Sequence, residues 1–148
     1  MKAVVQRTAR AGVSIDGETV GRIDRGLLVL LGIEPDDGEA DIEYMVKKCS
    51  GLRIFEDENG KMNLSVQDVG GSILLVSQFT LLGDARKGNR PSFTGAAVPE
   101  KAIPIYERVI SELAKRLPVQ TGVFGADMQV ELVNDGPVTI LLDSKRTY

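Results

Sequence analysis

Two uninterrupted apolar runs, residues 26–33 and residues 73–76, dominate the hydrophobic pattern of this chain. A strand with one solvated face alternates apolar and polar residues, whereas a strand covered on both faces is apolar throughout. Gly70 and Gly71 break the chain just before the second run. The pattern therefore predicts two strands that are buried on both faces.

Weaker alternation elsewhere predicts the remaining strands. They cover residues 2–7, 13–20, 128–133 and 138–142, and the last of them is expected to be buried. Residues 13–20 alternate around Asp16 and Gly17, a pair that suits the positive φ angles of a type I′ hairpin turn. Residues 121–125 contain two glycines and are expected to form a connector.

Two segments have the spacing of a helix with one buried stripe. The stripe of the first segment is Ile42, Met45, Val46 and Cys49. The second segment covers residues 99–117, with Tyr106, Val109, Ile110, Leu113 and Leu117 on its stripe. Pro104 lies close enough to the start of this helix to be tolerated. Cys49 and Tyr106 are thus expected to pack in the core rather than to react.

These elements predict an α+β fold, because strands outnumber helices and two helices cannot cover both faces of a doubly wound sheet. We expect a curled, barrel-like and mostly antiparallel β-sheet with two packed helices. The chain of 148 residues shows no internal repeat, linker or low-complexity segment. It is therefore predicted to form a single domain over residues 1–148.

The charge and the missing residue types restrict the chemistry. A net charge of −3 argues against a protein that coats nucleic acid, but leaves room for a local basic patch. The chain has no histidine and one cysteine, which excludes a Ser-His-Asp triad and His- or Cys-rich zinc sites. The acidic residues 56–60 lack the ligand spacing of an EF-hand and read as a hairpin turn. We expect no metal and no cofactor.

The sequence also sets an expectation for location. No apolar run approaches the roughly 18 residues that a membrane-spanning helix needs. The first residues lack the apolar core of a signal peptide, and the single Cys49 cannot form an intrachain disulfide. We therefore expect a cytoplasmic protein with no membrane partner.

The second apolar run ends in an unusual way. It continues into Ser77, Gln78 and Thr80, three hydrogen-bonding side chains interrupted by the ring of Phe79. A buried hydroxyl or amide left unpaired costs about 1–3 kcal/mol, so each of these groups needs a partner. The alternatives are internal hydrogen bonds, a polar ligand, or the solvated exit of an edge strand.

A flexible basic loop follows directly. Residues 83–91 are rich in glycine and contain the cations Arg86, Lys87 and Arg90. A polar strand end beside such a loop suggests a site for an anionic ligand. Lys145 and Arg146 near the last residue could serve the same purpose, although cations in such tails are usually only solvated.

Residues 134–137, Asn-Asp-Gly-Pro, lie between the last two predicted strands. These residue types favour turn conformations, and a proline after glycine can adopt a cis peptide bond. On spacing alone, a plain hairpin turn is the favoured interpretation. The alternative is that Gly136 and Pro137, which have little side-chain bulk, present bare carbonyl oxygens to a ligand.

Several of these stretches together resemble the D-aminoacyl-tRNA deacylase family over essentially the full length. The matching motifs are Ser77-Gln78-Phe79-Thr80-Leu81, Arg86-Lys87-Gly88, Arg90-Pro91-Ser92-Phe93 and Asn134-Asp135-Gly136-Pro137-Val138-Thr139. Gln6-Arg7, residues 52–55 and residues 124–128 match as well. Gly12 and Gly83 stand where bulkier residues are expected, outside both main motifs.

The resemblance implies a hydrolase of the ester between a D-amino acid and the 3′-terminal adenosine of tRNA. It implies that glycine is accepted and L-amino acids are rejected. It further implies a homodimer with its site at the subunit interface. There Ser77, Gln78, Phe79 and Thr80 would meet Gly136 and Pro137 of the partner copy, joined by a cis peptide bond. Arg86, Lys87 and Arg90 would contact tRNA phosphates.

Such a site needs a mechanism without histidine. An aminoacyl ester is already activated, and the neighbouring 2′-hydroxyl of the ribose can assist an attacking water. The protein then has to fix the geometry and stabilise the oxyanion. A threonine nucleophile needs a neighbouring base, and none lies within residues 77–82, so we expect Thr80 to orient or donate. Two other classes of protein stay open, a non-catalytic RNA-end-binding module and a structural homodimer.

Overall fold

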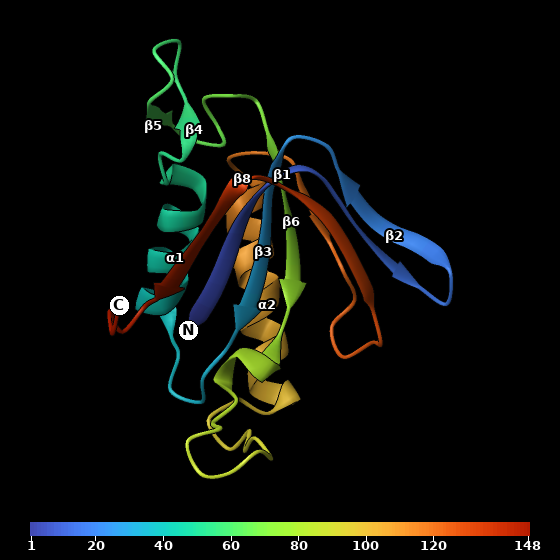
Figure 1. Ribbon diagram of the computed structural model, residues 1–148. Helices are drawn as coiled ribbons and strands as arrows, with labels where there is room; N and C mark the ends of the chain where they lie inside the picture. Colours follow the sequence, from blue (N-terminus) through green and yellow to red (C-terminus); the bar gives the residue numbers. More distant parts are fainter.

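The structure is a computed structural model that describes residues 1–148. One curled six-stranded sheet forms its centre, and two helices lie against one face of that sheet (Figure 1). The strands of the sheet are β1 (Lys2–Ile15), β2 (Glu18–Ile23), β3 (Gly26–Gly32), β6 (Ser72–Ser77), β7 (Val119–Thr121) and β8 (Gln129–Asp143). The helices are α1 (Glu39–Gly51), α2 (Pro99–Ala114) and the short 3₁₀ helix η1 (Phe79–Leu82). A separate hairpin consists of β4 (Phe55–Glu56) and β5 (Met62–Leu64).

The sheet is mixed, and its parallel strands lie toward the β7 end. β1 pairs antiparallel with β2, β3 and β8, whereas β3, β6 and β7 run parallel to one another. The curl brings β2 back to β7, where a Cβ on Gly21 would lie 2.5 Å from the carbonyl oxygen of Thr121. Glycine at that position therefore permits the near closure of the sheet. The predicted α+β, barrel-like fold is confirmed.

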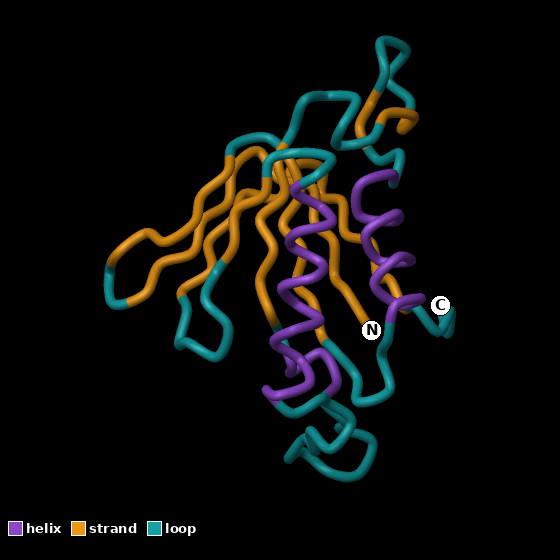
Figure 2. The backbone as a smooth tube through the Cα atoms, turned by 180° about the vertical axis from the view of Figure 1, so that it is seen from behind, coloured by secondary structure: helices purple, strands orange, loops and turns teal.

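Both faces of β3 and β6 are buried, as the two apolar runs predict. On one face, which the helices cover (Figure 2), Ile73 and Leu75 belong to the main hydrophobic core. On the other face, Leu74 packs in a second core with Ala11 and Val13 of β1. This second core exists because the far half of β1 folds over the back of the central strands. Neither helix has the length and apolar character that crossing a membrane requires.

Most of the predicted elements are confirmed, including both helices and the hairpin at Asp16 and Gly17, whose φ angles are 49° and 82°. Four differences stand out. β1 does not end at residue 7 but continues to Ile15, and an unpredicted strand, β7 (Val119–Thr121), ends on the first residue of the expected connector at residues 121–125. The third concerns residues 128–142. The predicted hairpin there is wrong, because both halves pair with β1 and form the single strand β8. Nor are residues 138–142 fully buried, because Leu141 is 54% exposed.

Candidate functional site

The polar end of β6 lines a cleft of about 290 Å³. Ser77, Gln78, Phe79 and Thr80 all contribute to its wall, so the structure brings these four predicted residues together. The rest of the wall is largely apolar and comes from β3, the start of α2 and the loop after β7. Its members include Leu31, Ile33, Ala97, Ala102, Phe124, Ala126, Asp127 and Met128. The sequence places Phe124 in a connector and Met128 at the start of a strand, but no local pattern predicts that this loop lies against β6.

Residues 78–82, which we name the cleft turn, are held in place by main-chain hydrogen bonds. The Gln78 N–H donates to the Leu31 carbonyl at 2.8 Å, which extends the β3–β6 ladder one residue beyond the strand. The Leu81 N–H donates to the Gln78 carbonyl at 3.2 Å and begins the 3₁₀ helix. The turn packs directly on Gly32, where a Cβ would lie 2.4 Å from Leu82 Cδ2 and 3.1 Å from the Gln78 oxygen.

The cleft turn carries several hydrogen-bond donors at the start of η1. The main-chain N–H groups of Phe79 and Thr80 precede the first hydrogen bond of η1, so they have no partner within that helix, and no side chain accepts from them. The Gln78 side-chain amide donates to Thr80 Oγ1 at 2.6 Å, which leaves the Thr80 hydroxyl proton available. Donors beside an apolar wall are the arrangement that binds developing negative charge on a carbonyl oxygen.

Aromatic rings lie above and below this end of β6. Phe79 is 57% exposed, and its ring meets that of Phe93 edge-on, with centroids 5.3 Å apart. Below it, the buried Tyr106 hydroxyl donates to the Leu75 carbonyl at 2.9 Å. Burial raises the pKa of Tyr106 to about 12, so this phenol stays protonated at neutral pH and has a structural role. Burial likewise raises the pKa of Cys49 to about 12.

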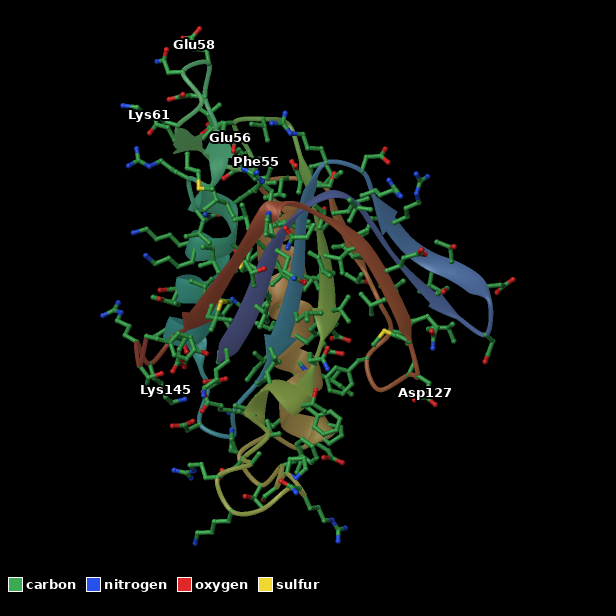
Figure 3. The ribbon with its side chains drawn as sticks, in the orientation of Figure 1. Phe55, Glu56, Glu58, Lys61, Asp127 and Lys145 are labelled. Carbon is green, nitrogen blue, oxygen red and sulfur yellow. The ribbon has the colours of Figure 1, made fainter.

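Ionisable groups are scarce in the cleft. Asp127 is the one ionisable side chain on its wall, and Figure 3 shows it at the end of the loop after β7. It is exposed and forms no ion pair. No group of three or more His, Cys, Asp or Glu side chains is arranged to hold a metal ion. The arrangement can therefore position and polarise a substrate, but offers no obvious protein base.

The basic loop after the cleft turn is exposed and only lightly anchored. Main-chain hydrogen bonds join Asp84 and Ser92, at the two ends of the loop. Arg86 folds back on Asp84 with two side-chain hydrogen bonds of 2.9 and 2.7 Å, which lower the pKa of the Asp84 carboxyl to about 2. Lys87 and Arg90 have no ionic partner. Of the three predicted phosphate-binding cations, two are thus free and one is already paired.

The cations near the last residue do not join this loop. Lys145 contacts three carboxylates, those of Glu34 at 2.9 Å, Asp36 at 3.1 Å and Asp37 at 3.3 Å. The Met1 ammonium binds the same Glu34 and Asp37 at 2.6 and 2.9 Å. This ionic cluster ties the first and last strands to the loop before α1, at the side of the molecule where Figure 3 labels Lys145. It has a stabilising rather than a ligand-binding arrangement.

Gly136 and Pro137 lie in an excursion of β8. Between the pairs Gln6–Thr139 and Thr8–Asn134, one residue of β1 faces residues 135–138, which we name the β8 bulge. The Gly136–Pro137 peptide bond is cis. Gly136 has a φ of 150°, and a Cβ on it would lie 2.7 Å from Val138 Cγ2, so no other residue fits.

Two side chains hold the β8 bulge. Asn134 closes its neck, because its Oδ1 accepts from the Val138 N–H at 2.8 Å and its Nδ2 donates to the Val138 carbonyl at 3.2 Å. Arg7 supports it from β1 and is only 4% exposed. Its Nε donates to the Asp135 carbonyl at 2.7 Å, and its Nη1 donates to the Ile54 carbonyl at 2.9 Å. No sequence pattern marks either role, because Arg7 reads as one polar residue in an alternating strand.

The cleft turn and the β8 bulge do not meet within one chain. Ser77 of β6 pairs with Leu31 of β3, and Leu31 pairs with Ala3 of β1. The β8 bulge, in contrast, lies beside Arg7 of β1. Four residues along β1 correspond to about 13 Å, and the three strand spacings from β6 to β8 add about 14 Å across the sheet. A site that contains both segments needs a second copy of the chain.

Comparison with known proteins gives a consistent result. A family model described as D-Tyr-tRNA(Tyr) deacylase matches residues 4–143. A D-aminoacyl-tRNA deacylase from Koribacter versatilis (strain Ellin345) is 62% identical over 149 residues, covering 100% of both chains. One from Kosmotoga olearia is 59% identical over 148 residues, again covering 100% of both.

Two solved structures are similar over nearly the whole chain. A structure titled c-Myc DNA Unwinding Element Binding Protein has a TM-score of 0.92 at 48% identity, covering 97% of this chain and 98% of that one. A probable eukaryotic D-amino acid tRNA deacylase has a TM-score of 0.79 at 18% identity, covering 95% and 97%. The second likeness shows the fold alone.

Proposed function

The chain belongs to the D-aminoacyl-tRNA deacylase family and is a hydrolase of ester bonds, and from this premise we propose how it acts. Its substrates are tRNAs that carry a D-amino acid or glycine on the 3′-terminal adenosine. The products are free tRNA and the amino acid. L-aminoacyl-tRNA is rejected. No cofactor takes part, because the ester is activated and the substrate supplies the assisting hydroxyl.

The cleft turn binds the reacting ester. As water attacks the carbonyl carbon, negative charge grows on the carbonyl oxygen, and the N–H groups of Phe79 and Thr80 stabilise it. The 2′-hydroxyl next to the ester orients the water and relays its proton to the leaving 3′-oxygen. The ring of Phe79 and the apolar wall of the cleft limit the water that reaches the site.

Selection by handedness requires a homodimer in which the β8 bulge of the partner copy covers this cleft. The carbonyl oxygens of the partner's Gly136 and Pro137 hold the α-amino group of the substrate. With the ester and the amino group fixed, the side chain of a D-amino acid faces open space, whereas an L side chain meets the Gly-Pro main chain. Glycine has no side chain to clash and is accepted. The site does not distinguish one D-amino acid side chain from another.

The basic loop contacts the acceptor end of the tRNA. Lys87 and Arg90 are free to meet phosphates, and Arg86 contributes less because Asp84 already neutralises it. With so few phosphate contacts, binding weakens only modestly as the salt concentration rises.

The main-chain donors at the head of η1, in a cleft whose one ionisable side chain, Asp127, makes no hydrogen bond to them, best support a hydrolysis that relies on positioning. The test incubates the purified protein with D-Tyr-tRNA, L-Tyr-tRNA and Gly-tRNA and follows loss of the ester. Cleavage of the first and third, but not the second, is expected. D-Tyr-tRNA that ends in 2′-deoxyadenosine should be nearly inert.

The same assay separates the other classes of protein. Tight tRNA binding without ester loss would indicate an RNA-end-binding module, and neither binding nor cleavage would indicate a purely structural homodimer. A strong ranking of D-aminoacyl groups by size would contradict the proposed chirality mechanism. A monomer that retains full selectivity, as judged by light scattering at assay concentration, would contradict the shared site.

A further inference from the structure

We infer that Gln78 is a positioning residue that holds Thr80 as a hydrogen-bond donor, so that Thr80 stabilises the oxyanion and does not itself attack the ester. This role, which rests on the proposed function, follows from one side-chain contact and its surroundings. The Gln78 Nε2 amide lies 2.6 Å from Thr80 Oγ1 and donates to it.

The direction of that hydrogen bond determines what Thr80 can do. A hydroxyl has one proton and accepts through its oxygen lone pairs. Because the amide of Gln78 occupies a lone pair of Oγ1, the Thr80 proton is left to donate elsewhere, and no protein atom accepts it. Main-chain hydrogen bonds of the Gln78 N–H and carbonyl fix the backbone from which this side chain extends. The proton is therefore available to a ligand in the cleft.

The surroundings also disfavour a nucleophilic Thr80. A threonine nucleophile must lose its proton to an adjacent base. The one ionisable side chain on the cleft wall, Asp127, is exposed and makes no hydrogen bond to Thr80. In addition, the N–H of Gln78 draws electron density from the oxygen that would attack.

The chemical step follows without a covalent intermediate. Water forms a bond to the carbonyl carbon, and the π electrons move to the carbonyl oxygen, which accepts hydrogen bonds from the Thr80 hydroxyl and from the main-chain N–H groups. The oxyanion then collapses and the bond to the ribose 3′-oxygen breaks. That oxygen leaves with the electron pair and takes the proton that the attacking water gave up. Thr80 keeps its own proton throughout.

The decisive variant is Gln78→Glu. At pH 8 the introduced carboxylate accepts the Thr80 proton, so the donor to the oxyanion is lost and kcat falls about 10- to 100-fold with little change in KM. As the pH falls toward the pKa of glutamic acid, about 4.3, the neutral carboxyl group can donate to Oγ1 again, and the rate relative to wild type should recover. A nucleophilic Thr80 predicts the opposite, because the introduced carboxylate would supply the missing base and raise kcat at pH 8.

A double-mutant cycle tests whether Gln78 acts only through Thr80. Gln78→Leu and Thr80→Val should each lower kcat about tenfold, and the double variant should lose no more than either alone. Gln67→Glu is the matched control, since it adds the same charge at an exposed position outside the cleft and should leave kcat unchanged. Circular dichroism confirms that each variant folds.

The outcomes are distinct. A Gln78→Glu enzyme that is faster than wild type at pH 8, an acyl-Thr80 species found by mass spectrometry after rapid quenching, or additive losses in the cycle would each overturn this role and leave the proposed function standing. A wild-type protein that cleaves no D-aminoacyl-tRNA would overturn the proposed function, and this role with it.

Discussion

The cleft turn and the β8 bulge present main-chain groups in opposite ways. The cleft turn has the N–H groups of Phe79 and Thr80 at the start of η1, without a partner in that helix, and exposes the Phe79 ring. The β8 bulge, by contrast, uses the side chains of Arg7 and Asn134 to fix its backbone, and no side chain donates a hydrogen bond to the carbonyls of Gly136 and Pro137. One segment supplies donors and the other supplies acceptors.

The difference explains how a chain without histidine can recognise an aminoacyl ester. Such an ester has a carbonyl oxygen that needs donors and an α-ammonium group that needs acceptors. Main-chain groups can serve both, provided that each segment is rigid. In the cleft turn rigidity comes from packing on Gly32, and in the β8 bulge it comes from a buried guanidinium. The two segments should therefore respond differently to substitution.

The largest effect is expected from Arg7→Ala. It leaves the carbonyls of Asp135 and Ile54 without their donor, which should lower the free energy of unfolding by about 3 kcal/mol in urea denaturation. Activity toward D-Tyr-tRNA should fall with it. Arg10→Ala is the matched control, because Arg10 is exposed on the same strand and its loss should change stability by less than about 0.5 kcal/mol. Equal stability of the two variants would contradict the supporting role of Arg7.

Gly32→Ala should act on the cleft turn instead. The added methyl would lie 2.4 Å from Leu82 Cδ2, so the turn must move, at a cost of about 1–3 kcal/mol. Because displaced donors lose their alignment, kcat should fall by up to about 100-fold. Gly12→Ala, whose methyl would lie 3.6 Å from the nearest atom, the Gly21 oxygen, should be close to wild type. A fully active Gly32→Ala enzyme would show that the position of the turn does not matter.

Asn134→Ala should have an intermediate effect on stability and a specific effect on selectivity. It removes the side chain that joins the Val138 N–H and carbonyl, which should cost about 1–2 kcal/mol. A loosened β8 bulge should reject L-Tyr-tRNA less well while D-Tyr-tRNA is still cleaved. The measurement is the ratio of kcat/KM for the two substrates. An unchanged ratio would mean that this side chain only stabilises the fold.

The ionic cluster around Lys145 provides a third region that contributes stability alone. Burial raises the pKa of the Glu34 carboxyl, but hydrogen bonds from the Met1 ammonium and Lys145 outweigh it, so the pKa lies below its usual value. The stability from this lowered pKa is fully present above about pH 5 and is lost as the pH falls through about 4 toward the folded-state pKa. Urea denaturation from pH 7 to pH 3.5 measures it.

Lys145→Met should flatten that pH dependence and lower stability at pH 7 by only about 1 kcal/mol, because solvent screens a partly exposed ammonium. Lys101→Met, at an exposed position of α2 with no ion pair, is the control. Neither variant should change the ratio of D- to L-Tyr-tRNA cleavage. Stability that is constant between pH 7 and pH 4 would contradict the role of the cluster.

The smallest effects are expected in the basic loop. Lys87→Ala and Arg90→Ala should each raise KM for tRNA about threefold to tenfold and reduce the slope of log affinity against log salt by about 0.7–0.9. Arg86→Ala should do less, because Asp84 pairs with Arg86 in the free protein. If Arg86→Ala has the largest effect of the three, the Asp84 pair must open on binding.

The sequence predicts the central strands, both helices and the first hairpin well, because each follows from a local hydrophobic period or a turn dipeptide. It also indicates the cleft turn, since Ser77, Gln78 and Thr80 interrupt an otherwise apolar strand. It fails at the β8 bulge, where Asn134 and Gly136 read as a hairpin turn. Turn residues report only the local backbone conformation, and the long pairing of β8 with β1 is decided by residues more than 100 positions away.

The supporting residues are the other part that a single sequence does not reveal. Arg7 occupies a strand position where an arginine is normally solvated, and its burial depends on the distant carbonyls of Ile54 and Asp135. The loop around Phe124 reaches the cleft only because β7 pairs with β6, and residues 119–121 are too short a strand to recognise from alternation.

The excursion in β8 also limits how the length of this segment can vary. Between the pairs Arg10–Val133 and Gln6–Thr139, three residues of β1 face five residues of β8, so the surplus is an even number. Side chains alternate between the two faces of a strand. Two extra residues therefore leave the alternation unchanged from Leu132, before the excursion, to Leu142, after it. Deleting a single residue there would turn Leu142 to solvent and Leu141 toward the helices. We expect natural variation in the length of this segment to occur in steps of two.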